Sequence, residues 1–538
     1  MARQKPPRDT RGSALRAGPP RERTALRDNL EYFAILVLIV LLLRQVVVEA
    51  FRIQHGSMAP TLVGVHNEVR CPNCGWVFNV GRDRAAGTGQ VECPNCRYHW
   101  EGAATFDERN QPLVFRGPDW IWNAARTSAG VALAPTDAAN RVQRRASRIF
   151  VNKFIYRFRQ PRRWEVVVFL YPYYSLRCRT CGWRGQVRSV EEAICPDCGG
   201  TDFDVATKSF IKRVVGLPGE EVALRDGDVY INGRIARKPD HVQKELWFHV
   251  FDSDFMPRRE VKPTWDLGPA PQCWRLGLGA APLTLDARDA AEPVMASFGR
   301  RIVDFYSYDG LSFEVAPRTL GSPGRQEVGD CRIRARVTVL DKAPGGGDVI
   351  LGIDDAGRSF TVSVGVGPQA AAVLRDEGHT VQEAPARGLG VGEPQWLTLE
   401  NYDDRLVARI GDDEVFRFDY RAGAGGRRGV HFGGRRVQVR WDRIVIERDV
   451  HYGNVGNLGE ELAAQELEQD EYFVLGDNSP ASSDSRRWEE PGVPAAPPGR
   501  RGGRRGRRAA GVGACLVPRR RDHGAQGPVR GAFFGTPL

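Results

Sequence analysis

A serine and a lysine are the residues of this chain best placed to do chemistry. Ser57 lies in FRIQHGSMAPTL, residues 51–62, where Gly56 permits a tight backbone path just before it. Lys212 interrupts an apolar run in SFIKRVVGLPGE, residues 209–220. Burial on an inward strand face lowers the pKa of a lysine, and a neutral amine can take the proton of a serine hydroxyl. The two segments together predict a serine nucleophile with a lysine general base. Read alone, they are more typical of a turn serine and an exposed strand lysine.

A polar segment far along the chain offers supporting side chains. EYFVLGDNSPASSDSRRW, residues 471–488, begins as an apolar strand and runs into a turn rich in Gly, Asp, Asn and Ser. Its side chains can hydrogen-bond a nearby lysine, and Asp484 can pair with Arg486. The plainer interpretation of this segment is a solvated loop.

In their order, these three segments resemble the type I signal peptidases. That family has a Ser-Met-x-Pro-Thr segment just after a membrane helix, then a Lys-Arg-x-x-Gly-x-Pro-Gly-Glu strand, then a Gly-Asp-Asn…Ser-x-Asp-Ser-Arg box. WEVVVFLYP, residues 164–172, is similar to the family strand between the first two segments, and DGDVYINGR, residues 226–234, to the strand pair that usually follows the lysine strand. The resemblance covers less than a quarter of the chain, at about 51–62, 148–172, 208–240 and 445–488.

The resemblance implies a membrane-bound serine endopeptidase that uses a Ser-Lys dyad. Such an enzyme removes signal peptides from exported preproteins by cleavage after small residues, and it needs no cofactor for catalysis. In this chain Ser57 would attack the scissile carbonyl and Lys212 would take its proton. The alternative from another functional class is a catalytically impaired, membrane-anchored binding or adaptor protein on the same scaffold.

The resemblance also implies supporting roles in the site. The backbone N–H of Ser57 would help to form the oxyanion hole, and Ser482 would hydrogen-bond the lysine. Asp484 and Arg486 would brace the site. His55 stands where some members have a serine as the second oxyanion donor, so either the histidine or the backbone alone would serve here.

An apolar segment at residues 30–48 predicts a single transmembrane helix behind a basic tail at 1–29. Residues 1–30 carry eight Arg and Lys against three acidic residues, which predicts a cytoplasmic N-terminus and a catalytic part outside the cell membrane. The lipid bilayer would then be a partner of the chain. A cleaved signal peptide ending near Ala50 remains an alternative.

Eight of the eleven cysteines form four CxxC pairs. Two pairs fall in a first insertion at 71–100 and two in a second at 178–200, with spacings close to those of zinc ribbons. We expect two structural zinc sites, although disulfides are the alternative on an oxidising side of the membrane. The ligands would be Cys71, Cys74, Cys93 and Cys96 in the first insertion, and Cys178, Cys181, Cys195 and Cys198 in the second.

The fold class expected is mainly β. Many short alternating segments in residues 246–448 predict an inserted antiparallel β-sandwich of the jelly-roll type. Sandwiches of this type often bind glycans, so a glycan or a protein is its expected partner. The catalytic β core would then be assembled from four separate parts, at 49–70, 148–177, 205–245 and 449–488.

The last segment, 489–538, has a different composition. It holds ten arginines against three acidic residues, with much Gly, Pro and Ala and no lysine. We hypothesise a frameshift soon after Trp488; a genuine basic, disordered tail is the alternative. Because the basic excess of the chain lies in its two ends and not on a folded part, we expect no nucleic-acid partner.

Overall fold

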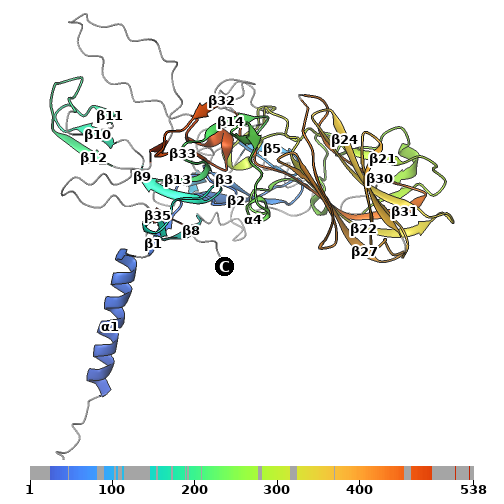
Figure 1. Ribbon diagram of the computed structural model, residues 1–538, viewed down its shortest axis with the longest axis horizontal. Helices are drawn as coiled ribbons and strands as arrows, with labels where there is room; N and C mark the ends of the chain where they lie inside the picture. Colours follow the sequence, from blue (N-terminus) through green and yellow to red (C-terminus); the bar gives the residue numbers. More distant parts are fainter. Residues whose placement is uncertain are drawn as a thin grey trace, which may run out of the picture.

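Strands dominate the structure, a computed structural model, and this confirms the mainly β class (Figure 1). The strands of the large insertion form one end of the molecule, and a long helix at residues 25–46 projects from the other. The basic segment before residue 25 and nearly all of 489–538 lie outside the residues that the structure describes. Those residues are 25–46, 48–81, 90–101, 105–106, 112–113, 146–152, 155–170, 174–187, 190, 193–206, 209–276, 282–315, 324–368, 370–423, 425–453, 462–486, 515–516 and 532–533.

The N-terminal helix is α1, Ala25–Val46. It ends two residues earlier than expected, because Val48 already belongs to the first strand. Its large apolar side chains from Leu30 to Leu41 are exposed. Among the helices within the described residues, none combines the length and hydropathy needed to cross a membrane. A helix is therefore present where the sequence predicts one, but its transmembrane character is not confirmed.

A seven-stranded antiparallel sheet carries the central strands of the catalytic segments. Two very short strands of the C-terminal segment join it, where the sequence predicts none. In spatial order the strands are β1 (Val48–Arg52), β8 (Arg148–Asn152), β35 (Ala532–Phe533), β9 (Val166–Leu170), β13 (Ser209–Gly216), β33 (Glu471–Leu475) and β34 (Cys515–Leu516).

Strand β13 lies between β9 and β33 in the sheet, and apolar clusters cover both of its faces. Its β-branched residues suit such a position, and Val214 and Val215 are at most 1% exposed. Each packs into a different apolar cluster, one on either side of the sheet. A central strand of this kind buries polar side chains on both faces as well, and this is what happens at Lys212 and Arg213.

A smaller antiparallel sheet continues from β13 through the Leu-Pro-Gly-Glu turn. Its strands are β16 (Arg234–Ile235), β15 (Asp228–Ile231), β14 (Glu221–Arg225) and β32 (Leu462–Glu466). The short helix α4, Asp240–Gln243, follows it and leads into the large insertion. The apolar cluster around Val222 and Phe473 joins this sheet to the seven-stranded one.

The cysteine-bearing segments form small separate sheets. The first consists of two hairpins, β2 (His66–Arg70) with β3 (Val77–Gly81), and β4 (Gln90–Glu92) with β5 (His99–Glu101). The second is a three-stranded sheet of β11 (Arg184–Val187), β10 (Tyr174–Cys178) and β12 (Phe203–Ala206). A further two-stranded pair joins β6 (Thr105–Phe106) and β7 (Pro112–Leu113).

The large insertion folds as two antiparallel sheets around one apolar core. One sheet holds β19 (Trp274–Arg275), β20 (Leu283–Asp286), β31 (Val437–Arg448), β22 (Cys331–Lys342), β27 (Pro394–Tyr402), β28 (Arg405–Ile410) and β29 (Asp413–Asp419), with β17 (Phe248–Asp252) beside β31. The other holds β18 (Trp265–Asp266), β21 (Val294–Phe298), β30 (Gly429–Arg435), β23 (Asp348–Asp355), β24 (Arg358–Gly365), β25 (Ala371–Asp376) and β26 (His379–Pro385).

Within the described residues, five single-turn 3₁₀ helices connect these parts, and two of them matter for the site. One, Ser307–Asp309 (η5), belongs to the large insertion, and one, Ser479–Ala481 (η6), follows β33. The others are Ile155–Arg157 (η2), Ser253–Phe255 (η3) and Pro271–Cys273 (η4).

Candidate active site

The structure brings Ser57 and Lys212 together. Lys212 lies on the central strand β13, and its Nζ is 2.9 Å from Ser57 Oγ. The same ammonium group donates to the carbonyl of Ile211 at 3.0 Å. Ser57 lies in the loop after β1, and that loop is held to the segment after β33 by a hydrogen bond from the Asn478 N–H to the Ser57 carbonyl, at 3.0 Å. Residues 155 positions apart therefore meet at hydrogen-bond distance.

The surroundings of Lys212 favour its neutral form. The side chain is 2% exposed, and burial lowers its pKa to about 8 from the ordinary value near 10.5. The negative charges of Asp484 and Asp477 act in the opposite direction and keep the pKa from falling further. A lysine with this pKa is partly neutral near physiological pH, so its amine can accept the proton of Ser57.

Asp484 and Arg486 form an ion pair that is held by two hydrogen bonds. The Arg486 Nε donates to one carboxylate oxygen at 2.9 Å and an Arg486 Nη donates to the other at 2.7 Å, and both side chains are fully buried. Burial alone would raise the pKa of Asp484, but the arginine charge outweighs burial and the pKa is lowered. The backbone N–H of Gly476 also donates to this carboxylate, at 3.0 Å. The pair thus holds the backbone at Gly476, where the polar segment after β33 begins.

Ser482 lies in the same buried layer. A Cβ placed on Gly476 would be 2.2 Å from Ser482 Oγ and 2.5 Å from the Ser57 carbonyl oxygen, so only glycine allows these parts to approach so closely. Ser482 is therefore adjacent to the nucleophile loop; its predicted bond to Lys212 stays a prediction. The His55 side chain is exposed on the same loop, and its role as an oxyanion donor also stays a prediction.

Sequence reasoning missed a second buried ion pair next to the first. Arg213 donates from Nε and one Nη to the two carboxylate oxygens of Asp477, each at 2.8 Å. The other Nη donates to the Trp164 carbonyl at 2.8 Å. Burial would lower the pKa of Arg213, but the charge of Asp477 reverses the effect and raises it. An arginine inside an apolar strand was the signal that could have identified this pair.

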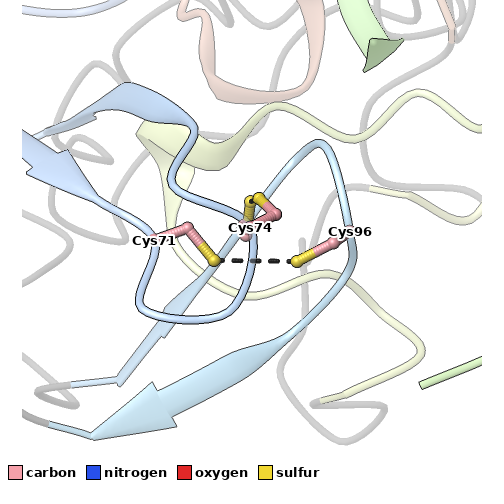
Figure 2. A group of neighbouring side chains, drawn as sticks. Cys71, Cys74 and Cys96 are labelled. Carbon is pink, nitrogen blue, oxygen red and sulfur yellow. Dashed lines mark hydrogen bonds between the residues drawn. The ribbon is translucent and has the colours of Figure 1, made fainter. Parts of the chain in front are cut away.

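The eight cysteines of the CxxC pairs lie in two groups of four. Within each group the sulfur atoms all lie within 4.8 Å of one another. Figure 2 shows Cys71, Cys74 and Cys96 pointing toward a common centre, with a 3.6 Å contact between the sulfurs of Cys71 and Cys96. In the second group the sulfurs of Cys178 and Cys198 are 3.5 Å apart, and those of Cys181 and Cys195 are 3.4 Å apart.

These sulfur separations fit a metal better than disulfides. Four thiolates around tetrahedral zinc, at a Zn–S distance of about 2.3 Å, lie about 3.8 Å from one another. A disulfide needs about 2.05 Å. The second sulfur pair of the first group, Cys74 with Cys93, is also 3.6 Å apart. Each group therefore has the donor set of a closed, structural zinc site, without the open position that a catalytic metal needs.

Comparison with known proteins links the middle of this chain to one family. Residues 129–273 match the family described as signal peptidase, peptidase S26. A curated protein of Synechocystis sp., probable signal peptidase I-2, is 34% identical over 88 residues, which are 16% of this chain and 28% of that protein. The chain thus matches less than a third of the relative's length. The family match includes Lys212 and leaves Ser57 and the 476–486 box outside. The two matches confirm the resemblance predicted from the motifs.

Solved structures resemble part of the chain weakly. The laminarinase of Rhodothermus marinus is 12% identical with a TM-score of 0.24, over 38% of this chain and 98% of that one. A carbohydrate-binding module of Bacillus subtilis is 12% identical with a TM-score of 0.20, over 35% and 94%. Similarity at this level assigns neither an activity nor a ligand.

Proposed function

We propose that this chain, which has its signal peptidase family segment at residues 129–273, is a serine endopeptidase that removes signal peptides from exported preproteins. The observation that carries the proposal is the 2.9 Å contact between Ser57 Oγ and the Nζ of Lys212, a lysine desolvated on a central strand. A nucleophile and a base of suitable pKa at this distance favour an enzyme over the binding or adaptor alternative.

The Ser-Lys dyad would act in two half-reactions. Neutral Lys212 takes the hydroxyl proton as Ser57 Oγ bonds to the scissile carbonyl carbon, and the backbone N–H of Ser57 hydrogen-bonds the developing oxyanion. The resulting ammonium gives its proton to the leaving amine, and this leaves an acyl-enzyme. A water molecule, deprotonated by Lys212, then attacks the ester, and the proton returns to Ser57 as the signal peptide is released.

The proposal includes attachment of the enzyme to the cell membrane through α1. In this arrangement the N-terminus is cytoplasmic and the catalytic part is extracytoplasmic, where exported preproteins arrive. The run of exposed apolar side chains on α1 supports it, together with the basic residues that precede the helix in the sequence. The preprotein would bind as an extended strand, with small residues before the cleavage site.

Cleavage of a preprotein with an Ala-x-Ala site tests the function, and its pH dependence tests the base. Because Lys212 acts as a neutral amine and has a pKa of about 8, kcat/KM should fall about tenfold for each pH unit below 8 and level off above it. If Lys212 had the ordinary lysine pKa near 10.5, kcat/KM would already fall below pH 10.5. Purified full-length protein that fails to cleave such substrates at pH 9, under conditions where a known signal peptidase does, would refute the proposal.

We also propose that each cysteine group holds a structural zinc ion. Cys71, Cys74, Cys93 and Cys96 would hold one, and the four cysteines of the three-stranded sheet the other. A bound zinc ion would cross-link the two CxxC turns of each group, beside the small apolar cluster that each group has.

Metal analysis of purified protein should find about two zinc ions per chain. Cys93→Ser should lower this by one ion, because three thiolates bind zinc less tightly than four, whereas Cys273→Ser should not change it. Cys273 lies in the sandwich insertion, outside both groups. Metal-free protein whose mass shows the loss of two hydrogens per cysteine pair would instead establish disulfides.

A further inference from the structure

The large insertion touches the nucleophile loop directly. Its 3₁₀ turn η5 presents Asp309 to the segment after β33, where the Asn478 Nδ2 donates to Asp309 Oδ1 at 2.9 Å. The same amide group donates to the Gly56 carbonyl at 3.2 Å. An amide nitrogen has two hydrogens, so one Asn478 side chain can serve both acceptors. Asp309, Asn478 and Gly56 therefore form a short chain of hydrogen bonds from the insertion to the residue before Ser57.

The last acceptor in this series of hydrogen bonds, the Gly56 carbonyl, can orient the N–H of Ser57. The carbonyl of Gly56 and the N–H of Ser57 belong to one planar trans peptide unit, and they point in opposite directions. Fixing the carbonyl oxygen therefore fixes the direction of the N–H. That oxygen accepts from Asn478 and from the Ala59 N–H, the latter at 3.0 Å. The Asn478 backbone N–H holds the other side of Ser57 through its carbonyl, at 3.0 Å.

Tyr308 packs the same turn against the loop. Cβ atoms placed on Gly56 and Gly81 would lie 1.9 and 2.5 Å from Cε1 of Tyr308, and one on Gly64 would lie 2.8 Å from its hydroxyl. The ring thus occupies a slot that three glycines leave open. Its hydroxyl donates to the Val65 carbonyl at 3.1 Å. Tyr308 is 6% exposed and Asn478 is fully buried, so the contact is an interior one.

We propose that Asp309 is a positioning residue for the oxyanion-binding N–H of Ser57 and acts through Asn478. The insertion is then part of the catalytic apparatus and not an appendage. This inference rests on the proposed peptidase function. By accepting from one hydrogen of the Asn478 amide, Asp309 sets the rotation of that amide, so that its other hydrogen meets the Gly56 carbonyl.

The test uses the full-length chain, the preprotein assay and two variants at position 309. Asp309→Ala should lower kcat by about 10- to 100-fold, less than the loss of a whole oxyanion donor, with KM changed little. The fall of kcat/KM below pH 8 should be the same as in wild type, because the substitution does not alter Lys212. Asp309→Asn keeps an acceptor oxygen and should restore most of kcat. Asp355→Ala is the matched control: this carboxylate is 5% exposed in the same insertion but bonds to Tyr420, at 2.7 Å.

A double-mutant comparison tests whether Asp309 acts through Asn478. Asn478→Ala should lower kcat at least as much as Asp309→Ala, and the double variant should be little worse than Asn478→Ala alone. Fully additive losses would show that Asp309 acts by another route. An Asp309→Asn variant as slow as Asp309→Ala, or an Asp355→Ala variant that loses kcat equally, would overturn the proposal.

Hydrogen exchange separates this inference from the proposed function. Deuterium uptake of a peptide spanning residues 53–62 should rise in Asp309→Ala and stay at the wild-type level in Asp309→Asn and Asp355→Ala. This measurement needs no activity. Wild-type protein without cleavage activity but with this exchange pattern would refute the function and keep the structural coupling. Unchanged uptake in Asp309→Ala would refute the coupling even in an active enzyme.

Discussion

Lys212→Met and Ser57→Ala should each reduce preprotein cleavage by at least about 10³-fold. The methionine fills the space of the lysine stem but cannot take a proton, and alanine removes the attacking oxygen. Because the two groups act as one unit at 2.9 Å, the double variant should be no slower than either single variant. Steady-state kcat/KM at pH 9, where wild-type Lys212 is mostly neutral, is the quantity to compare.

The folded state of these variants should be unharmed. Burying a lysine costs free energy, so replacing Lys212 with an apolar side chain of similar length should leave thermal stability equal or higher. Lys244→Met, at an exposed lysine of the chain, is the control and should cleave like wild type. Cleavage at the wild-type rate by either Ser57→Ala or Lys212→Met would show that the dyad is not the catalytic unit.

The order of the motifs predicted that Ser57 and Lys212 meet, because three segments in this order resemble those of the signal peptidases, whereas neither segment alone identifies its residue. The pattern does not tell whether one face of a strand is covered or both. Both faces of β13 are packed against apolar clusters, and Arg213 is therefore buried as well as Lys212. An isolated reading of strand alternation would place one of two successive residues in water.

Other features lay beyond any local pattern. Val46 to Val48 suit either the end of an apolar helix or the start of a strand, and their β-branched side chains favour the strand that the structure has at Val48. The contact of Asp309 with Asn478 joins residues 169 positions apart, in two differently folded parts. Such a contact depends on how an insertion packs on its host, and neither segment carries a signal for the other.

The Arg213–Asp477 pair should be the largest contributor to stability among the polar contacts of the site. Asp477→Ala should lower the free energy of unfolding by about 3–5 kcal/mol, because it leaves a buried arginine without its counter-charge. Arg213 is 2% exposed, and two of its hydrogen bonds end on that carboxylate. The arginine stays charged in the variant, since the pKa of a guanidinium is far above neutrality even when it is buried.

Urea unfolding followed by tryptophan fluorescence measures this loss. Trp164 is a suitable reporter, since it is 6% exposed and its carbonyl accepts from Arg213. Replacing both partners, as Arg213→Met with Asp477→Leu, should recover much of the loss, because the cost lies in the unpaired charge and not in the missing attraction. Asp286→Ala breaks an exposed pair with Arg288 and should leave unfolding unchanged. A loss in Asp477→Ala no greater than in this control would show that the pair orients the site without stabilising it.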